Sequence, residues 1–407
     1  MRTHAIGPHL EGALLRDGED PSLGPALTPR NARWNIAETD LPHVTLVAAA
    51  RPNFMKVGPV LRALDGRVRT TLVHTGQHYD DHMSRVFFEE LGLPRPDVNL
   101  GVGSGTHAAQ TAAVMVDFER HLMDSPTDAV VVVGDVNSTL AASLVATKMG
   151  VPVAHVEAGL RSGDWAMPEE VNRVLTDRMS RWLFNPSPDA DTNLRREGIP
   201  GSRIHRVGNV MIDTLMANLG RARARRPMLC HQLGDVARLL VLTLHRPSNV
   251  DDPAKLMQLI TAVANAAPDL PIVFPVHPRT AAQLEGVEGL PANLRCLPPL
   301  PYLDFVGLVA NADLVLTDSG GIQEETSVLG VPCLTIRDST ERPITCELGT
   351  NRLIGVDPAA IEPAVRQARM SVHRPARIPM WDGRAAERVA HVLVRDLERA
   401  RLSKVPA

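Results

Sequence analysis

The sequence DLVLTDSGGIQEETSVLG, residues 313–330, contains the pattern on which the fold assignment depends. Its apolar run, residues 314–316, is typical of a buried parallel strand, and the turn DSGG at 318–321 separates that run from a helix-like segment starting near Ile322. Glycines at such a turn let the backbone approach a ligand closely, and the free N–H groups of a helix start favour an anion such as phosphate. An ordinary capped turn of an α/β domain also explains these residues, so this stretch alone leaves both interpretations open.

The same order of strand, turn and helix recurs along most of the chain. Short apolar runs alternate with longer segments of helical spacing, which predicts parallel sheets with right-handed crossovers. The expected strands are residues 44–50, 70–75, 129–133, 151–156, 239–244, 272–276, 314–316 and 332–336. The expected helices lie over 54–64, around 86–91, up to about 123, from 137 or 138 to 149, from 168, around 256–263, from 322 and around 389–397.

One expected helix begins with PEE, residues 168–170. Proline suits the first helical position, and carboxylates suit the positive end of the helix dipole. The spacing of Val171, Leu175 and Met179 predicts that these three side chains face the core.

The length of 407 residues suits two domains better than one. Residues 1–40 show no sustained periodicity and are expected to form a poorly ordered extension. The strand and helix pattern pauses near Gly208, so we place a first α/β domain at 41–208 and a second at 209–380. Residues 381–407 are expected to form an amphipathic helix that crosses back to the first domain.

Composition excludes several function classes. A net charge of -3 with 22% charged residues, and only 3% aromatic residues, argues against a nucleic-acid partner. The four cysteines are widely separated and match no zinc or dithiol spacing, which indicates free thiols in a reducing compartment. No apolar run approaches the length of a membrane span, and the N-terminus lacks the order of a signal peptide. We therefore expect a cytoplasmic protein without a membrane partner.

Polar residues at the ends of the expected strands form the candidate site. In an open parallel sheet, ligands bind outside the carboxyl ends of the strands, so these side chains are expected to converge between two domains. The set combines an anion site with cations and with carboxylates that can act as acid and base. Its members are Arg51, Asp135, Glu157, His245, His277, Ser319 and Gly320, with Lys56 and Arg342 nearby in sequence.

Each of these residues also has an ordinary structural interpretation. Asp135 can simply cap the next helix, and Glu169 and Arg173, four positions apart, can form a surface ion pair. A lone histidine such as His245 is more often structural. Glu157 is harder to explain in this way, because a carboxylate that ends the apolar run VPVAHV must be paired or solvated in a cleft.

A series of longer segments carries a resemblance to a known family. These are RPNFMK at 51–56, TGQHYD at 75–80, GDVNSTL at 134–140, HVEAGLRSGDWAMPEEVNRVLTD at 155–177, LTLHRPSNVD at 242–251, PVHPR at 275–279, TDSGGIQEE at 317–325 and RDSTERPIT at 337–345. In this order, across roughly residues 43–400, the sequence resembles the non-hydrolysing UDP-N-acetylglucosamine 2-epimerases. That family has two Rossmann-like domains whose parallel sheets face an interdomain cleft, the architecture called GT-B.

The resemblance implies reversible inversion at C2 of UDP-GlcNAc to give UDP-ManNAc. UDP is eliminated with loss of the C2 proton, which leaves 2-acetamidoglucal, and it adds back after reprotonation on the other face. The resemblance also implies a homodimer and no metal or redox cofactor. By motif, the implied catalytic residues are Asp135, Glu157, Glu169 and His245. The implied substrate-binding residues are Arg51, Lys56, Arg173, His277, Phe305, Ser319, Gly320, Gly321, Glu325 and Arg342, with Glu325 on the ribose hydroxyls and Phe305 beside the uracil.

This sequence departs from the family pattern in three places. It has AAARPN at 48–53 where many members have a GTRPE-like sequence, and losing that glycine changes how closely a phosphate can approach. Val136 follows Asp135 where threonine is common. Gln77 is kept, but the HYD that follows it differs from the version that binds a second UDP-GlcNAc as an allosteric activator, which argues against that regulation.

Three other functions stay open at this point. A hydrolysing 2-epimerase would release free ManNAc and UDP from a similar site. A GT-B glycosyltransferase would need an acceptor and would show no deuterium uptake at C2. A non-catalytic nucleotide-sugar-binding protein would be expected to lack the carboxylates, whereas Asp135, Glu157 and Glu169 are all present.

Overall fold

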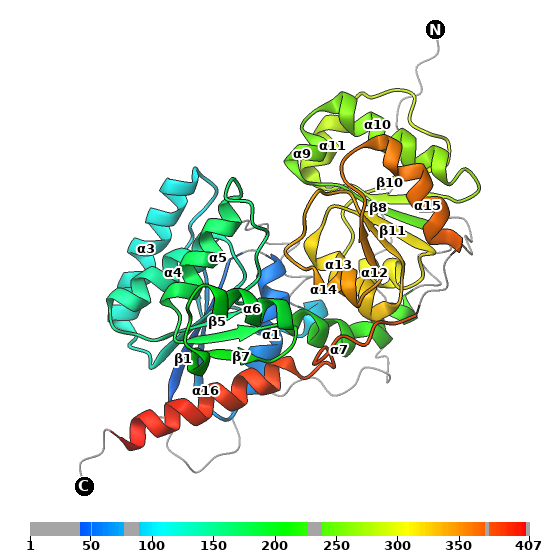
Figure 1. Cartoon of the computed structure of the whole chain (residues 1–407). Coiled ribbons are helices and arrows are strands. Elements are labelled where there is room, and N and C mark those ends of the chain that lie inside the picture. Colours follow the sequence, from blue (N-terminus) through cyan, green and yellow to red (C-terminus); the bar gives the residue numbers. More distant parts are fainter. Residues whose placement is uncertain (1–40, 50, 77–88, 226–237, 371–373, 404–407) are drawn as a thin grey trace, which may run out of the picture. The chain divides into compact units, whose positions relative to one another are not determined.

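The computed structural model describes residues 41–49, 51–76, 89–225, 238–370 and 374–403. The expected extension, residues 1–40, lies outside these ranges, as do residues 86–88 of the helix expected around 86–91. Residues Leu41–Ala407 form one compact unit, which contains two parallel sheets with helices packed on them (Figure 1). The predicted α/β class with two Rossmann-like sheets is confirmed.

The first sheet has seven parallel strands in the order β3-β2-β1-β4-β5-β6-β7. Unbroken valine runs are typical of strands covered on both faces, and all five residues of β4, AVVVV, are buried. The strands are β1 (His43–Ala48), β2 (Arg69–His74), β3 (Val98–Asn99), β4 (Ala129–Val133), β5 (Val153–Val156), β6 (Trp182–Asn185) and β7 (Ile204–Arg206).

Helices cover both faces of this sheet. Side chains alternate along a strand, so Val44 and Leu46 of β1 belong to one core cluster and Val47 belongs to another. The first cluster includes residues of α1 (Arg51–Leu64) and α16 (Ala385–Leu402), and the second includes residues of α3 (His107–Asp124) and α4 (Asn137–Lys148). Helices α5 (Pro168–Met179) and α6 (Pro188–Arg196) complete this part of the chain.

The second sheet has six parallel strands in the order β10-β9-β8-β11-β12-β13. Helices α10 and α15 supply Leu256, Ile260 and Val365 to the core on one face, and α12 and α13 supply Leu308 and Ile322 to the core on the other. The strands are β8 (Leu240–Thr243), β9 (Ile272–Pro275), β10 (Leu294–Leu297), β11 (Leu314–Thr317), β12 (Cys333–Thr335) and β13 (Asn351–Leu353). The helices are α9 (Pro247–Val250), α10 (Pro253–Ala266), α11 (Pro278–Leu284), α12 (Tyr302–Val309), α13 (Gly320–Leu329), α14 (Ile344–Glu347) and α15 (Ile361–Met370).

Helix α7 (Val210–Ala224) contacts α1, α12 and α13, and therefore joins the two sheets. It starts at Val210, two residues after Gly208, near which the sequence pattern was expected to pause. Gly208 has φ +91, and a Cβ there would collide with the carbonyl oxygen of Met380, so only glycine fits this turn. The carboxylate of Asp213 in α7 accepts the backbone N–H groups of Ala385 (3.1 Å) and Ala386 (2.7 Å), which caps the start of α16.

Helix α5 does not bury the side that its sequence predicts. The apolar positions Val171, Leu175 and Met179 were expected to face the core, but Leu175 is 44% exposed. The reason is that the inward face of α5 is filled by a network of charged and polar side chains instead of apolar contacts. Its buried residues are Glu170, Asn172, Arg173, Thr176 and Asp177.

Among the described residues, no helix combines the length and the apolarity that crossing a membrane requires.

Candidate active site

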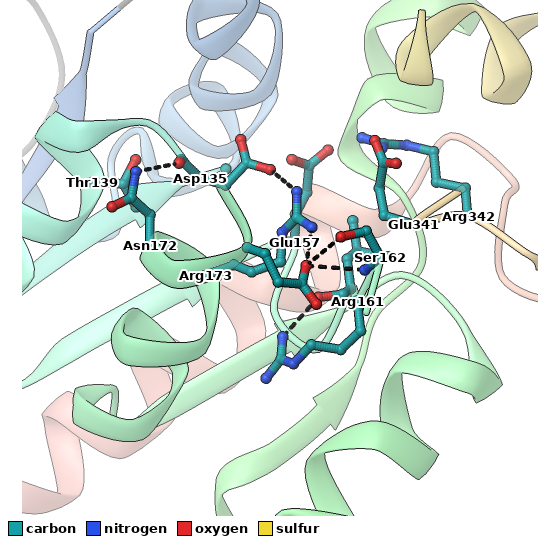
Figure 2. A network of polar contacts seen from close by, with 12 residues as sticks. Asp135, Thr139, Glu157, Arg161, Ser162, Asn172, Arg173, Glu341 and Arg342 are labelled. Carbon is teal, nitrogen blue, oxygen red and sulfur yellow. Dashed lines mark hydrogen bonds and ion pairs between the residues drawn. The ribbon is translucent and has the colours of Figure 1, made fainter. Parts of the chain in front are cut away.

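The turn after β5 holds Glu157 in a rare backbone conformation. Glu157 has φ +74, and L-residues other than glycine seldom adopt this region. Its carboxylate is buried, and Oε2 forms an ion pair with Nζ of Lys56 from α1. The other oxygen, Oε1, is buried and has no hydrogen-bond partner among the described residues. Glu157 thus presents one carboxylate oxygen that is still able to accept a proton (Figure 2).

Gly134, at the end of β4, makes room for this pair. A Cβ added at Gly134 would lie 3.2 Å from Nζ of Lys56 and 3.7 Å from Oε2 of Glu157. Gly134 also has φ +69, so a side chain there would be strained as well as crowded. The chain therefore brings Asp135, the next residue, close to the Lys56–Glu157 pair.

Arg173 of α5 holds Asp135 in place. Its Nη2 lies 2.5 Å from Oδ2 of Asp135, and its Nη1 pairs with Glu170 (Figure 2). Burial raises the pKa of Asp135, but the charges of Arg173 and Lys56 outweigh this and hold the pKa below the ordinary aspartate value. Asp135 is therefore an anion at neutral pH, and it is not the simple helix cap that its position also allowed, because α4 has no side-chain cap.

Glu170, a residue that sequence reasoning did not assign to the site, fixes the loop before α5. Its carboxylate accepts the backbone N–H groups of Ser162 and Gly163, each at 2.9 Å. Burial raises the pKa of Glu170, whereas these N–H groups and Arg173 lower it more strongly. The preceding residue, Glu169, is exposed. The surface ion pair considered for Glu169 and Arg173 is absent from the described contacts, in which Arg173 pairs with Asp135 and Glu170.

A buried charge cluster lies beneath these turns. Nδ1 of His155 in β5 is 2.6 Å from Asp177, and Nε2 is 2.8 Å from the carbonyl oxygen of Gly134. Asp177 also accepts Gly159 N–H and pairs with Arg161, so it is ionised and both ring nitrogens of His155 must donate. This arrangement ties α5 to the turn that carries Asp135.

The strand ends of the second sheet carry two histidines. His245 follows β8, His277 follows β9, and their ring centroids are 5.6 Å apart. His277 caps α11, because its Nδ1 accepts the backbone N–H of Arg279 at 3.2 Å. Nδ1 of His245 lies 2.8 Å from the carboxylate of Asp318, which is fully buried. Sequence reasoning treated Asp318 only as a turn residue.

The turn from Ser319 to Gly321 begins α13. Ser319 is the N-cap residue, but its hydroxyl makes no capping bond, which leaves it available to a ligand. A Cβ on Gly320 would lie 2.7 Å from both Nη1 of Arg342 and Oε1 of Glu341. Gly320 is therefore needed for the close approach of a side-chain ion pair, a role in addition to the predicted backbone approach to phosphate.

Arg342 forms ion pairs with two carboxylates beside the start of α13. Its guanidinium lies 2.7 Å from Glu324 and 2.5 Å from Glu341, and Glu341 also pairs with Arg337 at 2.8 Å. Burial lowers the pKa of Arg342, but the charges of Glu324 and Glu341 outweigh this and raise it, with smaller contributions from Glu157 and Asp135. Arg342, from the second sheet's side, thus acts electrostatically on the carboxylates of the first sheet (Figure 2).

The remaining predicted residues are Phe305 of α12 and Glu325 of α13, and Tyr302 of α12, which was not predicted, contacts Glu325. The hydroxyl of Tyr302 donates to Oε1 of Glu325 at 3.1 Å. Burial raises the pKa of Glu325 to about 7. Phe305, one turn after Tyr302, packs partly buried against the adjacent core.

The predicted residues therefore lie in two groups. The first is Lys56, Asp135, Glu157 and Arg173; the second is His245, His277, Ser319, Gly320, Gly321, Phe305, Glu325 and Arg342. Glu169 belongs to neither group by its described contacts and is exposed in the first turn of α5. Arg51 is the first residue of α1, and its side chain is not among those that the structure describes. Three residues that sequence reasoning missed, Glu170, Asp318 and Glu341, each adjoin a predicted residue inside PEE, TDSGG or TERP, and this adjacency was the available signal.

No group of three or more His, Cys, Asp and Glu side chains in the described ranges is arranged to hold a metal ion.

Comparison with known proteins gives a family and several relatives. The family model described as UDP-N-acetylglucosamine 2-epimerase matches residues 62–394. A protein of that name from Methanocaldococcus jannaschii is 41% identical over 360 residues, which cover 86% of this chain and 98% of that protein. The UDP-2,3-diacetamido-2,3-dideoxy-D-glucuronate 2-epimerase of Pseudomonas aeruginosa is 39% identical over 363 residues, covering 86% of this chain and 99% of that one.

A solved structure gives the same result in three dimensions. The crystal structure of the M. jannaschii protein in complex with UDP-GlcNAc and UDP is 40% identical in sequence and superposes with a TM-score of 0.81. The match covers 87% of this chain and 99% of that chain.

Proposed function

The chain belongs to the UDP-N-acetylglucosamine 2-epimerase family, and we propose that it interconverts UDP-GlcNAc and UDP-ManNAc by eliminating UDP and adding it back. The C2 hydrogen of the sugar is a weak acid. A positioned carboxylate must remove it while cationic groups neutralise the β-phosphate that leaves C1. Both kinds of group are present, carboxylates beside β4 and β5 and cations beside α13.

The state of Glu157 is the observation that carries this proposal. A buried carboxylate oxygen without a donor is costly, and a residue held at positive φ is strained. Lys56 keeps the second oxygen paired, so the group stays inside the site while Oε1 can accept a proton. The unpaired oxygen and the strained backbone are both explained if Oε1 accepts a proton from the substrate.

The remaining roles follow from position and charge. One carboxylate of the set Asp135, Glu157 and Glu169 removes the C2 proton, and another returns a proton on the opposite face. Ser319, the start of α13 and Arg342 bind the diphosphate, with His245 near the leaving oxygen. Glu325 accepts hydrogen bonds from the ribose hydroxyls, and Phe305 packs beside the uracil. The intermediate 2-acetamidoglucal must stay shielded from water, because its escape would lose product.

Solvent-deuterium incorporation tests the mechanism. Incubation with UDP-GlcNAc in heavy water should give a stable mixture of the two UDP-sugars with deuterium at C2. NMR of the anomeric signals measures both the mixture and the deuterium content. Glu157→Gln and Glu169→Gln should each lower the rate at least about 100-fold. Asp117→Asn, a change at a partly exposed position of α3 where Asp117 pairs with Arg120, should leave the rate unchanged.

Other outcomes would point to the other functions. A steady release of free UDP and reducing sugar would indicate a hydrolysing 2-epimerase. Transfer of the sugar to an added acceptor, with no deuterium incorporated at C2, would indicate a glycosyltransferase. Tight binding of UDP-GlcNAc without turnover would indicate a binding protein.

A second sugar is a specific candidate. The P. aeruginosa relative is named for a 2-epimerase reaction on UDP-2,3-diacetamido-2,3-dideoxy-D-glucuronate, and its identity to this chain, 39%, is close to the 41% of the UDP-GlcNAc relative. The same C2 chemistry serves either sugar. Comparing kcat/KM for both UDP-sugars decides between them, since the true substrate should be preferred by at least about tenfold.

A further inference from the structure

Asp318 lies directly behind His245. It ends β11 in the turn before α13, its side chain is fully buried, and its Oδ1 is 2.8 Å from Nδ1 of His245. The same carboxylate accepts the backbone N–H groups of His245 at 3.0 Å and Arg246 at 2.9 Å, and Nδ2 of Asn249 at 3.2 Å. Each of these partners is a donor, so the carboxylate is held in one orientation.

The charge of Asp318 determines which ring nitrogen carries the proton. Burial raises the pKa of Asp318, but the hydrogen bond and charge of His245 and the N–H of Arg246 outweigh this and hold the pKa below the ordinary value. An ionised carboxylate can only accept hydrogen bonds, so Nδ1 of His245 must carry a hydrogen. Nε2 is then left to exchange a proton, on a ring whose side chain is 38% exposed and which lies beside His277.

We propose that Asp318 is a positioning residue of the reaction, which fixes the Nδ1–H tautomer of His245 so that Nε2 can give a proton to the departing phosphate oxygen and take it back. This inference rests on the proposed function. In the elimination, the C1–O bond breaks with its electron pair moving to the β-phosphate oxygen, and the C2–H electrons form the C1–C2 double bond. The C2 proton passes to a carboxylate, and the His245 ring, which carries hydrogens on both nitrogens at the start of this step, gives its Nε2 proton to the phosphate oxygen. The ring is then left neutral, with its hydrogen on Nδ1. Re-addition reverses these transfers, with the proton delivered to the opposite face of C2.

The alternative is that Asp318 only stabilises the turn after β8. Its bonds to the backbone of His245 and Arg246 would serve that purpose without any effect on the ring. A purely structural role predicts lower stability, but it predicts neither a particular tautomer of His245 nor an effect that depends on that histidine.

The tautomer can be measured in the wild-type protein without turnover. In protein labelled with 15N-histidine, long-range 1H–15N NMR distinguishes the two ring nitrogens, and His245→Gln identifies the signal among the 15 histidines. The neutral His245 ring should carry its hydrogen on Nδ1. A neutral ring with the hydrogen on Nε2 would overturn the proposal even if the enzyme is fully active.

Kinetics then test whether Asp318 acts through His245. Asp318→Asn should lower kcat at least about 100-fold with KM changed by less than about threefold, because the amide donates to Nδ1 and favours the wrong tautomer. In the His245→Gln background, Asp318→Asn should add less than about a threefold loss. An equal loss in both backgrounds would assign Asp318 a structural role and reject the proposal.

Asp251→Asn is the matched control. Asp251 lies six residues after His245 and pairs with Arg279 on the surface, so its loss should leave kcat unchanged. If the wild type shows no epimerase activity while His245 still carries its hydrogen on Nδ1, the proposed function fails and the Asp318–His245 arrangement stands.

Discussion

The buried carboxylates of the site have opposite protonation preferences because their neighbours differ. Burial raises the pKa of each, but Asp135 and Glu341 face arginines that outweigh it and lower their pKa values. For Glu324 and Glu325 burial dominates, and their pKa values are raised. The proposed epimerisation removes and returns a proton, and such chemistry requires groups whose proton affinities differ.

Glu325 is expected to destabilise the folded protein above neutral pH. Its folded pKa of about 7 lies above the ordinary 4.5, so its contribution to stability is fully present below about pH 4.5 and is lost as the pH rises through about 7. Glu325→Gln, which is neutral throughout, should be more stable than the wild type at pH 8 by on the order of 3 kcal/mol, and similar to it at pH 5. Urea unfolding at both pH values measures this.

The same substitution should weaken UDP binding, because the amide is a poorer acceptor for ribose hydroxyls. Glu362→Gln, an exposed change on α15, is the control and should have no comparable pH-dependent effect on stability. A stability gain of equal size at pH 5 and pH 8 would contradict the raised pKa of Glu325.

Gly320 and Gly321 are adjacent, but they are expected to respond differently to alanine. At Gly320 a Cβ would meet Arg342 and Glu341 at 2.7 Å, so Gly320→Ala must displace a buried ion pair. At Gly321 the nearest atom is Cε of Met211 at 3.8 Å, which is ordinary contact. We expect Gly320→Ala to cost about 1–3 kcal/mol of stability and to raise KM at least about tenfold.

Gly321→Ala should be neutral or stabilising by up to about 1 kcal/mol, because alanine favours a helix over glycine. Thermal unfolding and steady-state kinetics of both variants provide the comparison. Equal effects of the two substitutions would show that Arg342 does not occupy the space above Gly320.

Among the secondary-structure elements, α5 shows how a local pattern can mislead. Its apolar residues repeat with helical spacing, yet the buried face carries Glu170, Arg173 and Asp177. These charges are tolerated because each has partners on other elements, such as Asp135 after β4 and His155 in β5. The helix therefore positions the site through ion pairs as well as by packing.

Leu175→Ala distinguishes the two descriptions of α5. A core leucine would cost about 2–5 kcal/mol on truncation, whereas the 44% exposed Leu175 should cost no more than about 0.5 kcal/mol. Chemical unfolding gives the value. A loss above about 2 kcal/mol would place Leu175 in the core, as its sequence spacing suggested.

At the scale of the whole molecule, the C-terminal helix α16 is part of the first sheet's core. Val389 and Leu393 share a core cluster with Leu46 and Val131, residues more than 250 positions earlier in the chain. Trp182 Nε1 also donates to Asp396 at 2.9 Å. Because α16 follows the second sheet in sequence, the chain passes through the second sheet before it completes the core of the first.

Leu393→Ala should therefore destabilise the core of the first sheet. Leu393 is fully buried, so truncation should cost about 2–5 kcal/mol. Leu402→Ala, in the same helix at a position 75% exposed, should cost no more than about 0.5 kcal/mol. Calorimetry measures both variants. An equal loss of stability in Leu393→Ala and Leu402→Ala would show that α16 does not pack in the core through Leu393.

The sequence by itself determined the alternation of strands and helices and the polar residues that end the longer strands, such as Glu157 and His245. These features follow from local apolar runs and turn residues. The strands β7 (IHR) and β13 (NRL) were not predicted, because they contain no apolar run, and such residues form a strand only when a neighbouring strand pairs with them.

Only the tertiary structure decided which charges meet. Arg173 pairs with Asp135, and Asp318 with His245, across separations of 38 and 73 residues. Strand order and helix packing bring such residues together, and no local pattern specifies a partner at that distance. The elements were therefore predictable from the chain, whereas the pairing that sets protonation and orientation in the site depends on the fold.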